Sequence, residues 1–220
     1  FRKMFVNEGP FHIVANFAAH KHVRSEKDHY SIEAMIDNNV FKAKEFLDLL
    51  SANKPEHFFC VSTDKAANPV NVMGASKKRM EEVIMAYSND IKITTARFAN
   101  VAFSNGSLLD GYIQRLFKKQ PISCPSDVKR FFVSPGESGQ ICMLACILGA
   151  SGEIYFPKLE EDQMVNFKDI TLDFFKEMAI AVTECLSDDD ARNRAASISI
   201  EDPHPVYFFT ADTSGEKLYE

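Results

Sequence analysis

The feature that most constrains the fold is a regular alternation of strand-like and helix-like segments in the N-terminal half. Short apolar runs at residues 12–17, 57–62 and 91–98 have the length and composition of buried strands. Between them, residues 32–50 and 71–87 place apolar side chains at helical spacing. Strands that alternate with helices of this length pair in parallel, because each helix returns the chain to the end of the sheet where the strand began. The sequence therefore predicts an α/β fold, with a parallel sheet covered by helices.

Beyond residue 101 the pattern becomes less regular. We expect residues 102–220 to form a second, smaller α/β domain, and residues 1–101 to form the first. Residues 187–199, in which three Asp are followed by Arg, Asn and Arg, predict an exposed linker or loop. The shorter segments that we assign to the second domain are residues 107–119, 136–148 and 154–156.

A Gly-rich turn between a strand and a helix is absent from the sequence. In doubly wound sheets that turn brings backbone N–H groups to the pyrophosphate of a dinucleotide, so the usual phosphate cradle is missing. Residues 1–6 have helical character, and the sequence stops directly after residues 216–220. We therefore expect a doubly wound sheet without its first strands and Gly-rich turn, as in an excerpt or a cleaved product.

The charge balance limits the classes of ligand. The net charge is -6, with 25 Lys and Arg against 31 Asp and Glu. Nucleic-acid affinity depends on basic side chains that neutralise phosphates, so we expect no nucleic-acid partner. The longest apolar stretch, near residues 141–148, is far below the roughly 20 residues that a membrane-spanning helix needs, and we expect no membrane segment.

The cysteines indicate a reduced protein. Cys142 and Cys146 stand four apart on an expected helix and share one face, but two ligands alone do not make a zinc site. We therefore expect reduced core thiols, a cytoplasmic location and no structural metal. The five cysteines are an odd number and form no CxxC pair; they lie at positions 60, 124, 142, 146 and 185.

Polar side chains follow the strand expected at residues 57–62. They are Thr63, Asp64 and Lys65. Ligands of doubly wound sheets bind beyond the carboxyl ends of the strands, so this hydroxyl, carboxylate and amine are the first candidates for a site. Taken alone, the same three residues are also typical of a polar turn that caps the next helix.

The next helix carries Met73 and Lys77, four residues apart and therefore on one face. The run from Val61 to Lys77, VSTDKAANPVNVMGASK, resembles the signature of the UDP-N-acetylglucosamine 4,6-dehydratases. These are polysaccharide biosynthesis proteins of the extended short-chain dehydrogenase/reductase superfamily. Their Thr-Asp-Lys precedes Tyr-x-x-x-Lys or Met-x-x-x-Lys, so the resemblance favours a catalytic site over an ordinary turn.

The resemblance spans nearly the whole chain. It implies that residues 1–101 are a partial Rossmann-type cofactor domain and that residues 102–220 mainly bind the nucleotide sugar. Other segments similar to the family are residues 16–23 on the cofactor side, 38–40 in the following helix, 97–101 with 105–107 at the entry of the substrate domain, 129–132 in the sugar-nucleotide loop, and 215–220 at the C-terminus.

The resemblance also implies roles for residues. The family uses NAD or NADP to oxidise carbon 4 of the sugar, loses water across carbons 5 and 6, and returns the hydride to carbon 6. Thr63 would hold the 4-hydroxyl, Asp64 would protonate the departing 6-hydroxyl, and Lys65 would take or relay the carbon 5 proton. Lys77 would hold the nicotinamide ribose. Further cofactor contacts are assigned to Ala18, Ala19, Lys21 and Asn39, and substrate contacts to Asn100, Asn105, Ser107, Arg130 and Lys217.

Met73 departs from the pattern of most short-chain dehydrogenases, which have a Tyr here that accepts the 4-hydroxyl proton. A thioether cannot accept that proton, so Asp64, Lys77 or a bound water are the candidate bases. One branch of the dehydratases carries Met at this position, and we interpret Met73 as a mark of that branch.

Isolated charges near the motifs are ambiguous. Arg97, Arg130 and Lys217 could pair with a diphosphate, because guanidinium forks match phosphate oxygens, but isolated charges are more often solvated surface. A histidine at position 20 or 22 is more often a packing residue than a catalytic one.

Two other functions compete with the dehydratase. A nucleotide-sugar 4-epimerase would share the fold, cofactor and substrate class, but it has no hydroxyl to protonate and expel, so Thr63, Asp64 and Lys65 favour dehydration. A non-catalytic module that kept the fold would fit the missing Gly-rich turn and Met73. Under the dehydratase hypothesis we expect the substrate to be a UDP-N-acetylhexosamine, the cofactor to be NAD or NADP, and the protein to be a homo-oligomer.

Overall fold

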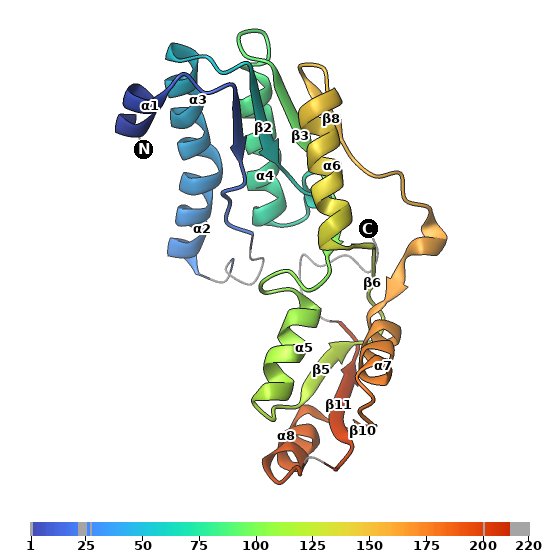
Figure 1. Ribbon diagram of the computed structural model, residues 1–220. Coiled ribbons are helices and arrows are strands. Elements are labelled where there is room, and N and C mark those ends of the chain that lie inside the picture. The colour runs from blue at the N-terminus through green and yellow to red at the C-terminus, as the bar shows by residue number, and fades with distance from the viewer. Residues whose placement is uncertain (1, 22–25, 27, 200, 212–220) are drawn as a thin grey trace. The chain divides into compact units, whose positions relative to one another are not determined.

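The structure, a computed structural model, describes residues 2–21, 26, 28–199 and 201–211 (Figure 1). The chain forms two compact units, and each combines two separate stretches of sequence. The first unit combines Phe1–Phe98 with Gly136–Lys158, and the second combines Ala99–Pro135 with Leu159–Glu220.

The first unit has a four-stranded sheet with the order β1-β2-β3-β8, in which every pairing is parallel. One row across the sheet runs from Ala15 through Phe59 and Thr94 to Glu153. This arrangement confirms the predicted α/β fold with a parallel sheet. The elements are α1 Arg2–Glu8, β1 Ile13–Asn16, α2 His29–Ile36, η2 Asp37–Phe41, α3 Lys42–Ala52, β2 His57–Val61, η3 Asp64–Ala66, α4 Val72–Met85, β3 Ile93–Ala96, α6 Pro135–Leu148 and β8 Glu153–Tyr155.

Helices cover both faces of this sheet, as Figure 1 shows, with α3 and α4 on one face and α6 on the other. Successive side chains of a strand point to opposite faces of the sheet, so the side chains of β2 pack against helices on both faces. Phe58 and Cys60 belong to the core cluster that also contains residues of α3 and α4. Phe59 packs with Cys142 and Ala145 of α6. The unit is therefore doubly wound, and β2 is buried from both sides.

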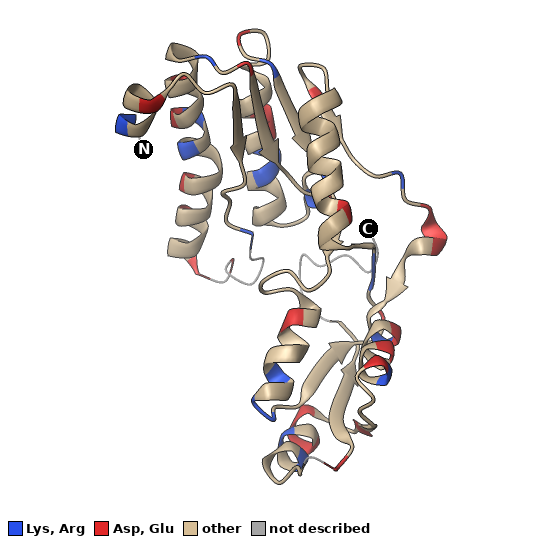
Figure 2. Ribbon diagram, viewed as in Figure 1, with Lys and Arg blue, Asp and Glu red and all other residues tan. Residues whose placement is uncertain are grey.

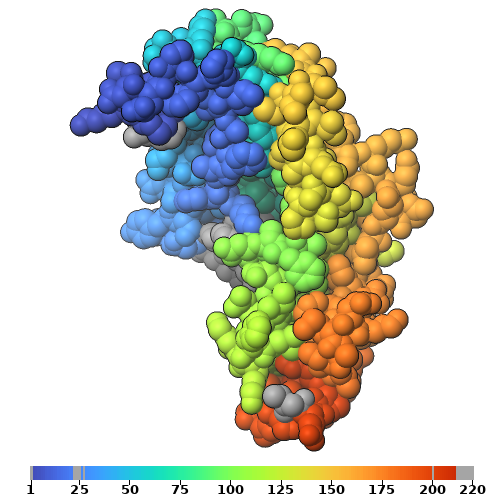
Figure 3. Space-filling model, viewed as in Figure 1, coloured from blue at the N-terminus to red at the C-terminus, as the bar shows by residue number. Residues whose placement is uncertain are grey.

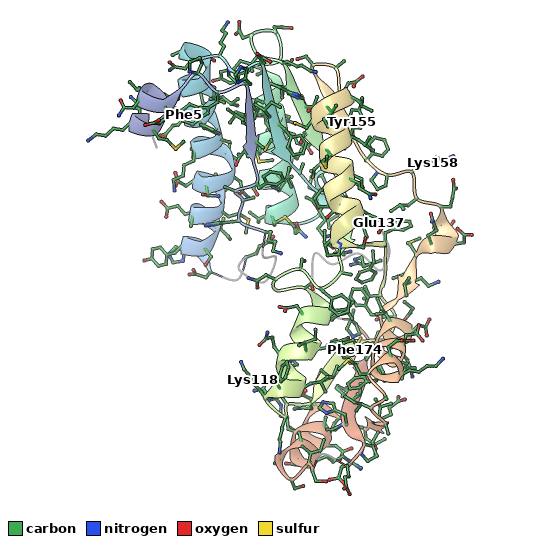
Figure 4. The ribbon with its side chains drawn as sticks, in the orientation of Figure 1. Phe5, Lys118, Glu137, Tyr155, Lys158 and Phe174 are labelled. Carbon is green, nitrogen blue, oxygen red and sulfur yellow. The ribbon has the colours of Figure 1, made fainter. Side chains whose placement is uncertain are left out.

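Helix α1 is attached to the same core by an aromatic side chain. Phe5 is buried, and its ring meets Phe46 of α3 edge to face at 5.6 Å and Phe11 at 4.9 Å. Figure 4 labels Phe5 where α1 lies beside α3. Edge-to-face aromatic pairs contribute beyond the area that they bury, so these contacts hold α1 on the unit.

The second unit has its own parallel sheet, with the order β10-β11-β5. Its core contains Leu109 and Tyr112 of α5 and Phe174 and Phe175 of α7, and Phe174 is labelled in Figure 4. The elements are β4 Asn100–Val101, α5 Leu108–Phe117, β5 Ile122–Pro125, β6 Lys129–Arg130, β7 Phe132–Val133, η4 Glu161–Gln163, β9 Val165–Asn166, α7 Phe167–Glu177, β10 Val182–Cys185, α8 Asp188–Ala196 and β11 His204–Phe209.

Helix α6 and strand β8 pack with the first unit, whereas the sequence assigned residues 136–148 and 154–156 to the second domain. The physical reason is long-range pairing, since β8 adds to the sheet next to β3 and α6 covers Phe59. In Figure 2, α6 carries almost no charge, and in Figure 3 its yellow atoms lie against the blue and teal atoms of the same unit. Instead of a single boundary after residue 101, the chain passes from the first unit to the second, back to the first and again to the second. The roles that the sequence assigned to the two domains remain proposals.

The expectation of a linker or loop at residues 187–199 was wrong, because most of this segment is helix α8. The Ser187 side chain accepts a hydrogen bond from the backbone N–H of Asp190 and caps the helix. Acidic residues in a first turn interact favourably with the helix dipole, and Arg192 and Arg194 bind Asp188 and Asp190 one turn away. The charge run thus stabilises a surface helix.

All five cysteines are free thiols, and four of them are buried. Burial raises the pKa of the Cys60 thiol to about 11. Among the residues that the structure describes, no helix is long and apolar enough to cross a membrane. The described residues also contain no group of three or more His, Cys, Asp or Glu side chains placed to hold a metal ion.

Candidate functional site

The candidate site of the first unit lies where its parallel strands end. Strands β1, β2 and β3 end at Asn16, Val61 and Ala96, and parallel strands end at the same edge of a sheet. In α/β sheets this edge is where ligands bind. The segments that follow β1 and β2 contain Ala18, Ala19, Lys21 and the Thr-Asp-Lys sequence, so most of the predicted residues of this unit are at this edge.

Thr63, Asp64 and Lys65 form one hydrogen-bonded cluster. The Thr63 hydroxyl donates to Oδ1 of Asp64 at 2.7 Å, and the backbone N–H of Lys65 donates to the same oxygen at 2.8 Å. The Lys65 amine lies 3.3 Å from Oδ1 of Asp64. Both charged side chains are partly exposed, at 23% for Lys65 and 26% for Asp64. The cluster therefore pairs an acid and a base whose side chains are partly exposed, while Oδ2 of Asp64 is itself buried.

The conformation of the local backbone brings the three side chains of this cluster together. The Thr63 side chain caps the 3-10 turn η3, which begins at Asp64, three residues after β2 ends at Val61. The backbone of Ser62 pairs with Ala96 and that of Asp64 with Phe98, so the turn is tied to β3. The same residues thus form the capping turn and the charged cluster. The sequence left a polar turn and a catalytic site as alternatives, and this geometry is compatible with both.

Lys77 of α4 is buried, with 4% of its surface exposed. Its amine donates to the carbonyl of Val61 at 3.0 Å, at the last residue of β2. Burial lowers the pKa of Lys77, whereas nearby Cys60 and Glu81 act in the opposite direction. The helix therefore places a cation with an increased tendency to lose its proton directly behind the Thr-Asp-Lys turn.

The first turn of α4 approaches the Thr-Asp-Lys turn closely at Gly74. A Cβ added to Gly74 would lie 2.8 Å from the carbonyl oxygen of Lys65 and 3.1 Å from Oδ1 of Asn71, the residue that caps α4. Met73 is buried, at 4% exposed, and its N–H donates to the Glu26 carboxylate at 2.7 Å. Sequence reasoning missed Gly74 and Glu26; the small residue inside the motif was the available signal for Gly74.

The segment after β1 is held by side chains of its neighbours. The Asn16 side chain accepts a hydrogen bond from the Ala18 N–H at 3.0 Å, which turns the chain at the strand end. Ala18 and Lys21 are exposed, and Ala19 is half-buried. Asn39, by contrast, is buried in η2 and bonds to the backbone of His20. His22 and Val23 lie outside the described residues.

Arg97, which directly follows β3, forms an ion pair within the first unit. Its Nε donates to Oε1 of Glu81 at 2.8 Å, and its Nη2 donates to Oε2. Glu81 is buried, and 16% of the Arg97 side chain is exposed. These hydrogen bonds raise the pKa of Arg97. The guanidinium fork therefore ties β3 to α4, one turn after Lys77, instead of standing free for a phosphate.

We predict that Glu81→Gln lowers the free energy of unfolding by about 2 kcal/mol, because it leaves a mostly buried guanidinium without its counter-charge. Thermal and denaturant unfolding would measure the loss. The matched control is Glu82→Gln, which removes the exposed partner of Arg79 and is expected to change stability by less than about 0.5 kcal/mol. Equal losses in the two variants would contradict this prediction.

The predicted substrate residues belong to the second unit and do not form one cluster. Asn100 bonds to the carbonyl of Phe131 at 3.2 Å, and Ser107 caps α5. Asn105 is exposed in the turn before that helix. Arg130 is 5% exposed, bonds to the carbonyl of Lys129 and lies 5.9 Å from the ring of Phe167. The predicted residue Lys217 lies outside the described residues.

A surface groove of about 550 Å³ lies in the first unit between α2 with η2 and α4. Its lining is mostly apolar and includes Ile36, Val40, Val72 and Ser76. None of Thr63, Asp64 and Lys65 lines it, so it is separate from the Thr-Asp-Lys cluster.

The sequence of this chain matches a known protein family. Residues 2–193 match the family described as polysaccharide biosynthesis protein. The chain belongs to this family. The match covers the Thr-Asp-Lys turn, α4 with Lys77 and most of the second unit.

Three curated relatives show the range of this similarity. The chain is 32% identical over 173 residues to an uncharacterized membrane protein of Methanocaldococcus jannaschii, covering 76% of this chain and 50% of that protein. It is 35% identical over 136 residues to a UDP-glucose 4-epimerase of Rickettsia canadensis, covering 59% and 39%. It is 28% identical over 161 residues to an inverting UDP-N-acetylglucosamine 4,6-dehydratase of Campylobacter jejuni, covering 70% and 47%. The chain thus spans half or less of each of these relatives.

The fold agrees with that of a solved structure. The dTDP-glucose 4,6-dehydratase from Streptomyces venezuelae, solved with NAD bound, matches with a TM-score of 0.75 at 16% identity, over 100% of this chain and 67% of that one. At this identity the likeness concerns the fold. It confirms the Rossmann-like class of the fold.

Proposed function

We propose that this chain is the catalytic and nucleotide-sugar-binding portion of a 4,6-dehydratase. Its substrate would be a UDP-N-acetylhexosamine, with UDP-N-acetylglucosamine as the first candidate. The product would be a 4-keto-6-deoxy sugar nucleotide for surface polysaccharide or glycan synthesis. The observation that carries the proposal is the Asp64 and Lys65 pair, joined at 3.3 Å in the turn that follows β2.

The pair matches the proton balance of the elimination. Loss of water across carbons 5 and 6 removes a proton from carbon 5 and protonates the departing 6-hydroxyl. Lys65 would accept or relay the first proton, and Asp64, after taking up the proton of the 4-hydroxyl, would donate the second. The carbon 5 proton held by Lys65 would return to carbon 5 when carbon 6 is reduced. The proton that Asp64 gives to the departing hydroxyl would come from the 4-hydroxyl, so both side chains regain their starting forms.

The neighbouring residues support binding and orientation. Thr63 would hold the 4-hydroxyl, since its hydroxyl oxygen can still accept a hydrogen bond while its proton is donated to Asp64. The Lys77 ammonium lies behind the turn, where its charge would favour loss of the 4-hydroxyl proton. Met73 offers no proton acceptor, so that proton would pass to Asp64 or to water while Lys77 stays charged.

Lys77 is our candidate for the nicotinamide end of NAD or NADP. Lys77 has a buried amine that can donate to a ribose hydroxyl, and Ala18, Ala19 and Lys21 follow β1 at the same edge. The Gly-rich turn that holds a diphosphate is absent from the sequence. When bound, NAD or NADP would supply the hydride chemistry at carbons 4 and 6.

The decisive experiment is to incubate the gene product that contains this chain with UDP-N-acetylglucosamine and NAD or NADP. A dehydratase yields a product lighter by the mass of one water, with a carbonyl at carbon 4. A 4-epimerase, the rival favoured by the Rickettsia relative, yields a product of unchanged mass. Neither product would form if the chain were a non-catalytic module.

We further predict that the 220-residue chain alone binds the dinucleotide weakly or not at all. The backbone N–H groups of a Gly-rich turn at a helix N-terminus normally hold the diphosphate, and this sequence has no such turn. Titration calorimetry with NAD would test this. Binding of NAD to the isolated chain with micromolar affinity would contradict it.

A further inference from the structure

The side-chain amide of Asn39 is fully engaged within the first unit. Asn39 is 1% exposed. Its Oδ1 accepts from the His20 N–H at 2.8 Å, and its Nδ2 donates to the His20 carbonyl at 2.9 Å and to the Ser76 hydroxyl at 3.0 Å. An amide has two N–H donors, and both are used, so Asn39 has none left for a ligand.

The position of Asn39 depends on an irregular turn. Helices α2 and α3 are joined by the π turn η2, Asp37–Phe41, in which Asn39 is the buried residue. A π turn inserts an extra residue into a helix and commonly occurs at functional sites. Here the buried residue of that turn bonds to the segment after β1 and to α4.

Two connections then join the segment after β1 to the first turns of α4. The Ser76 hydroxyl, which receives the Asn39 N–H, donates to the Met73 carbonyl at 2.8 Å. The Glu26 carboxylate accepts from the Met73 N–H at 2.7 Å. Ser76 directly precedes Lys77, so Asn39 links the backbone of His20 to the helix turn that carries the buried lysine.

We propose that Asn39 is a positioning residue, which holds the segment after β1 against the Lys77 turn of α4 so that Ala18, Ala19 and Lys21 are presented in one fixed conformation. This differs from the direct cofactor contact expected from the sequence. The consequence for dinucleotide binding rests on the proposed function, whereas the link between His20 and α4 is a property of the fold. The two parts can therefore be tested separately.

The first test is hydrogen exchange in the 220-residue chain. Asn39→Asp keeps the size and Oδ1 of the side chain but, when ionised, loses both donors and faces the His20 carbonyl with a charge. We expect exchange of the His20 N–H to increase at least about tenfold, with the α4 amides near Met80 and Ile84 unchanged. Ser76→Ala, which removes only the bond from Asn39 Nδ2 to Ser76, should give a smaller increase. The control Asn7→Asp, the same substitution at an exposed position of α1, should give none.

The pH dependence separates positioning from general packing. Burial raises the pKa of a carboxylic acid, so the introduced Asp becomes neutral as the pH falls and regains one donor. Protection of His20 in Asn39→Asp, corrected for the intrinsic exchange rate, should therefore recover at low pH, while the native chain shows no such change. Unchanged exchange in Asn39→Asp, or an increase spread over the whole first unit, would overturn the proposal.

The second test uses the gene product with NAD. We expect Ser76→Ala and Asn39→Asp to raise the KM for NAD, by at least about tenfold for Asn39→Asp, with little change in kcat, because Lys77 keeps its bond to Val61. A loss confined to kcat would overturn the positioning role. If the native protein itself shows no NAD-dependent activity, the proposed function fails, and the exchange experiment still decides whether Asn39 holds the segment.

Discussion

Replacing Asp64 by Asn in the gene product is expected to slow the elimination by about a hundredfold to ten-thousandfold, the usual contribution of a general acid or base. The amide cannot be the proton donor for the departing 6-hydroxyl. It still offers an oxygen to the Thr63 hydroxyl and the Lys65 N–H, so the turn should keep its shape. Binding of the sugar nucleotide should therefore change far less than turnover.

The measurement is the rate of 4-keto-6-deoxy sugar formation, together with the affinity for the sugar nucleotide. Asp48→Asn is the matched control, because Asp48 lies on α3, away from the strand ends, where it binds Lys44 and Tyr87. That variant should keep near-normal turnover. Near-normal turnover of Asp64→Asn would remove Asp64 from the mechanism.

Lys77→Met is expected to lose at least about a hundredfold in turnover, whereas Met73→Leu should stay within about tenfold of the native enzyme. Lys77→Met removes the buried cation whose field favours deprotonation beside the cofactor. Met73→Leu exchanges one apolar side chain for another of similar volume, a change that usually costs less than about 1.5 kcal/mol in stability. The control Lys78→Met removes the neighbouring, half-buried lysine and should leave turnover nearly unchanged.

Unfolding measurements distinguish this loss from misfolding. Burial lowers the pKa of Lys77, so the folded state binds this proton less tightly than the unfolded state does, and the charged amine lowers stability at all pH values below its unfolded pKa. Lys77→Met should therefore melt no lower than the native chain. If Met73→Leu were inactive and Lys77→Met active, the assigned roles would be reversed.

Local pattern was sufficient to predict β1, β2 and β3 of the first sheet and to place Thr63, Asp64 and Lys65 after β2. The runs that became β1, β2 and β3 are short and apolar, and a polar sequence after a buried strand leaves few positions for Asp64 and Lys65. The return of α6 and β8 to this unit could not be read from local pattern, because it depends on pairing between β3 and a strand far along the chain.

The hydrogen-bond partners of individual side chains could not be predicted from the sequence either. Arg97 looked like a phosphate ligand, yet its fork is taken by Glu81, which comes from another element. Asn39 looked like a cofactor ligand, yet a π turn, which no apolar periodicity indicates, directs its amide to His20 and Ser76. At residues 187–199 the charges were interpreted as solvated loop, although Ser187 and the ion pairs one turn apart are typical of a capped helix.

The interleaving of the two units has a consequence for synthesis on the ribosome. The first sheet lacks its last strand until Tyr155 has emerged, and the central strand of the second sheet, β11, is made later still. During translation both sheets therefore expose unpaired strand edges, to which a second nascent chain could bind. We expect the yield of folded protein to depend on translation speed and on chaperones that shield these edges.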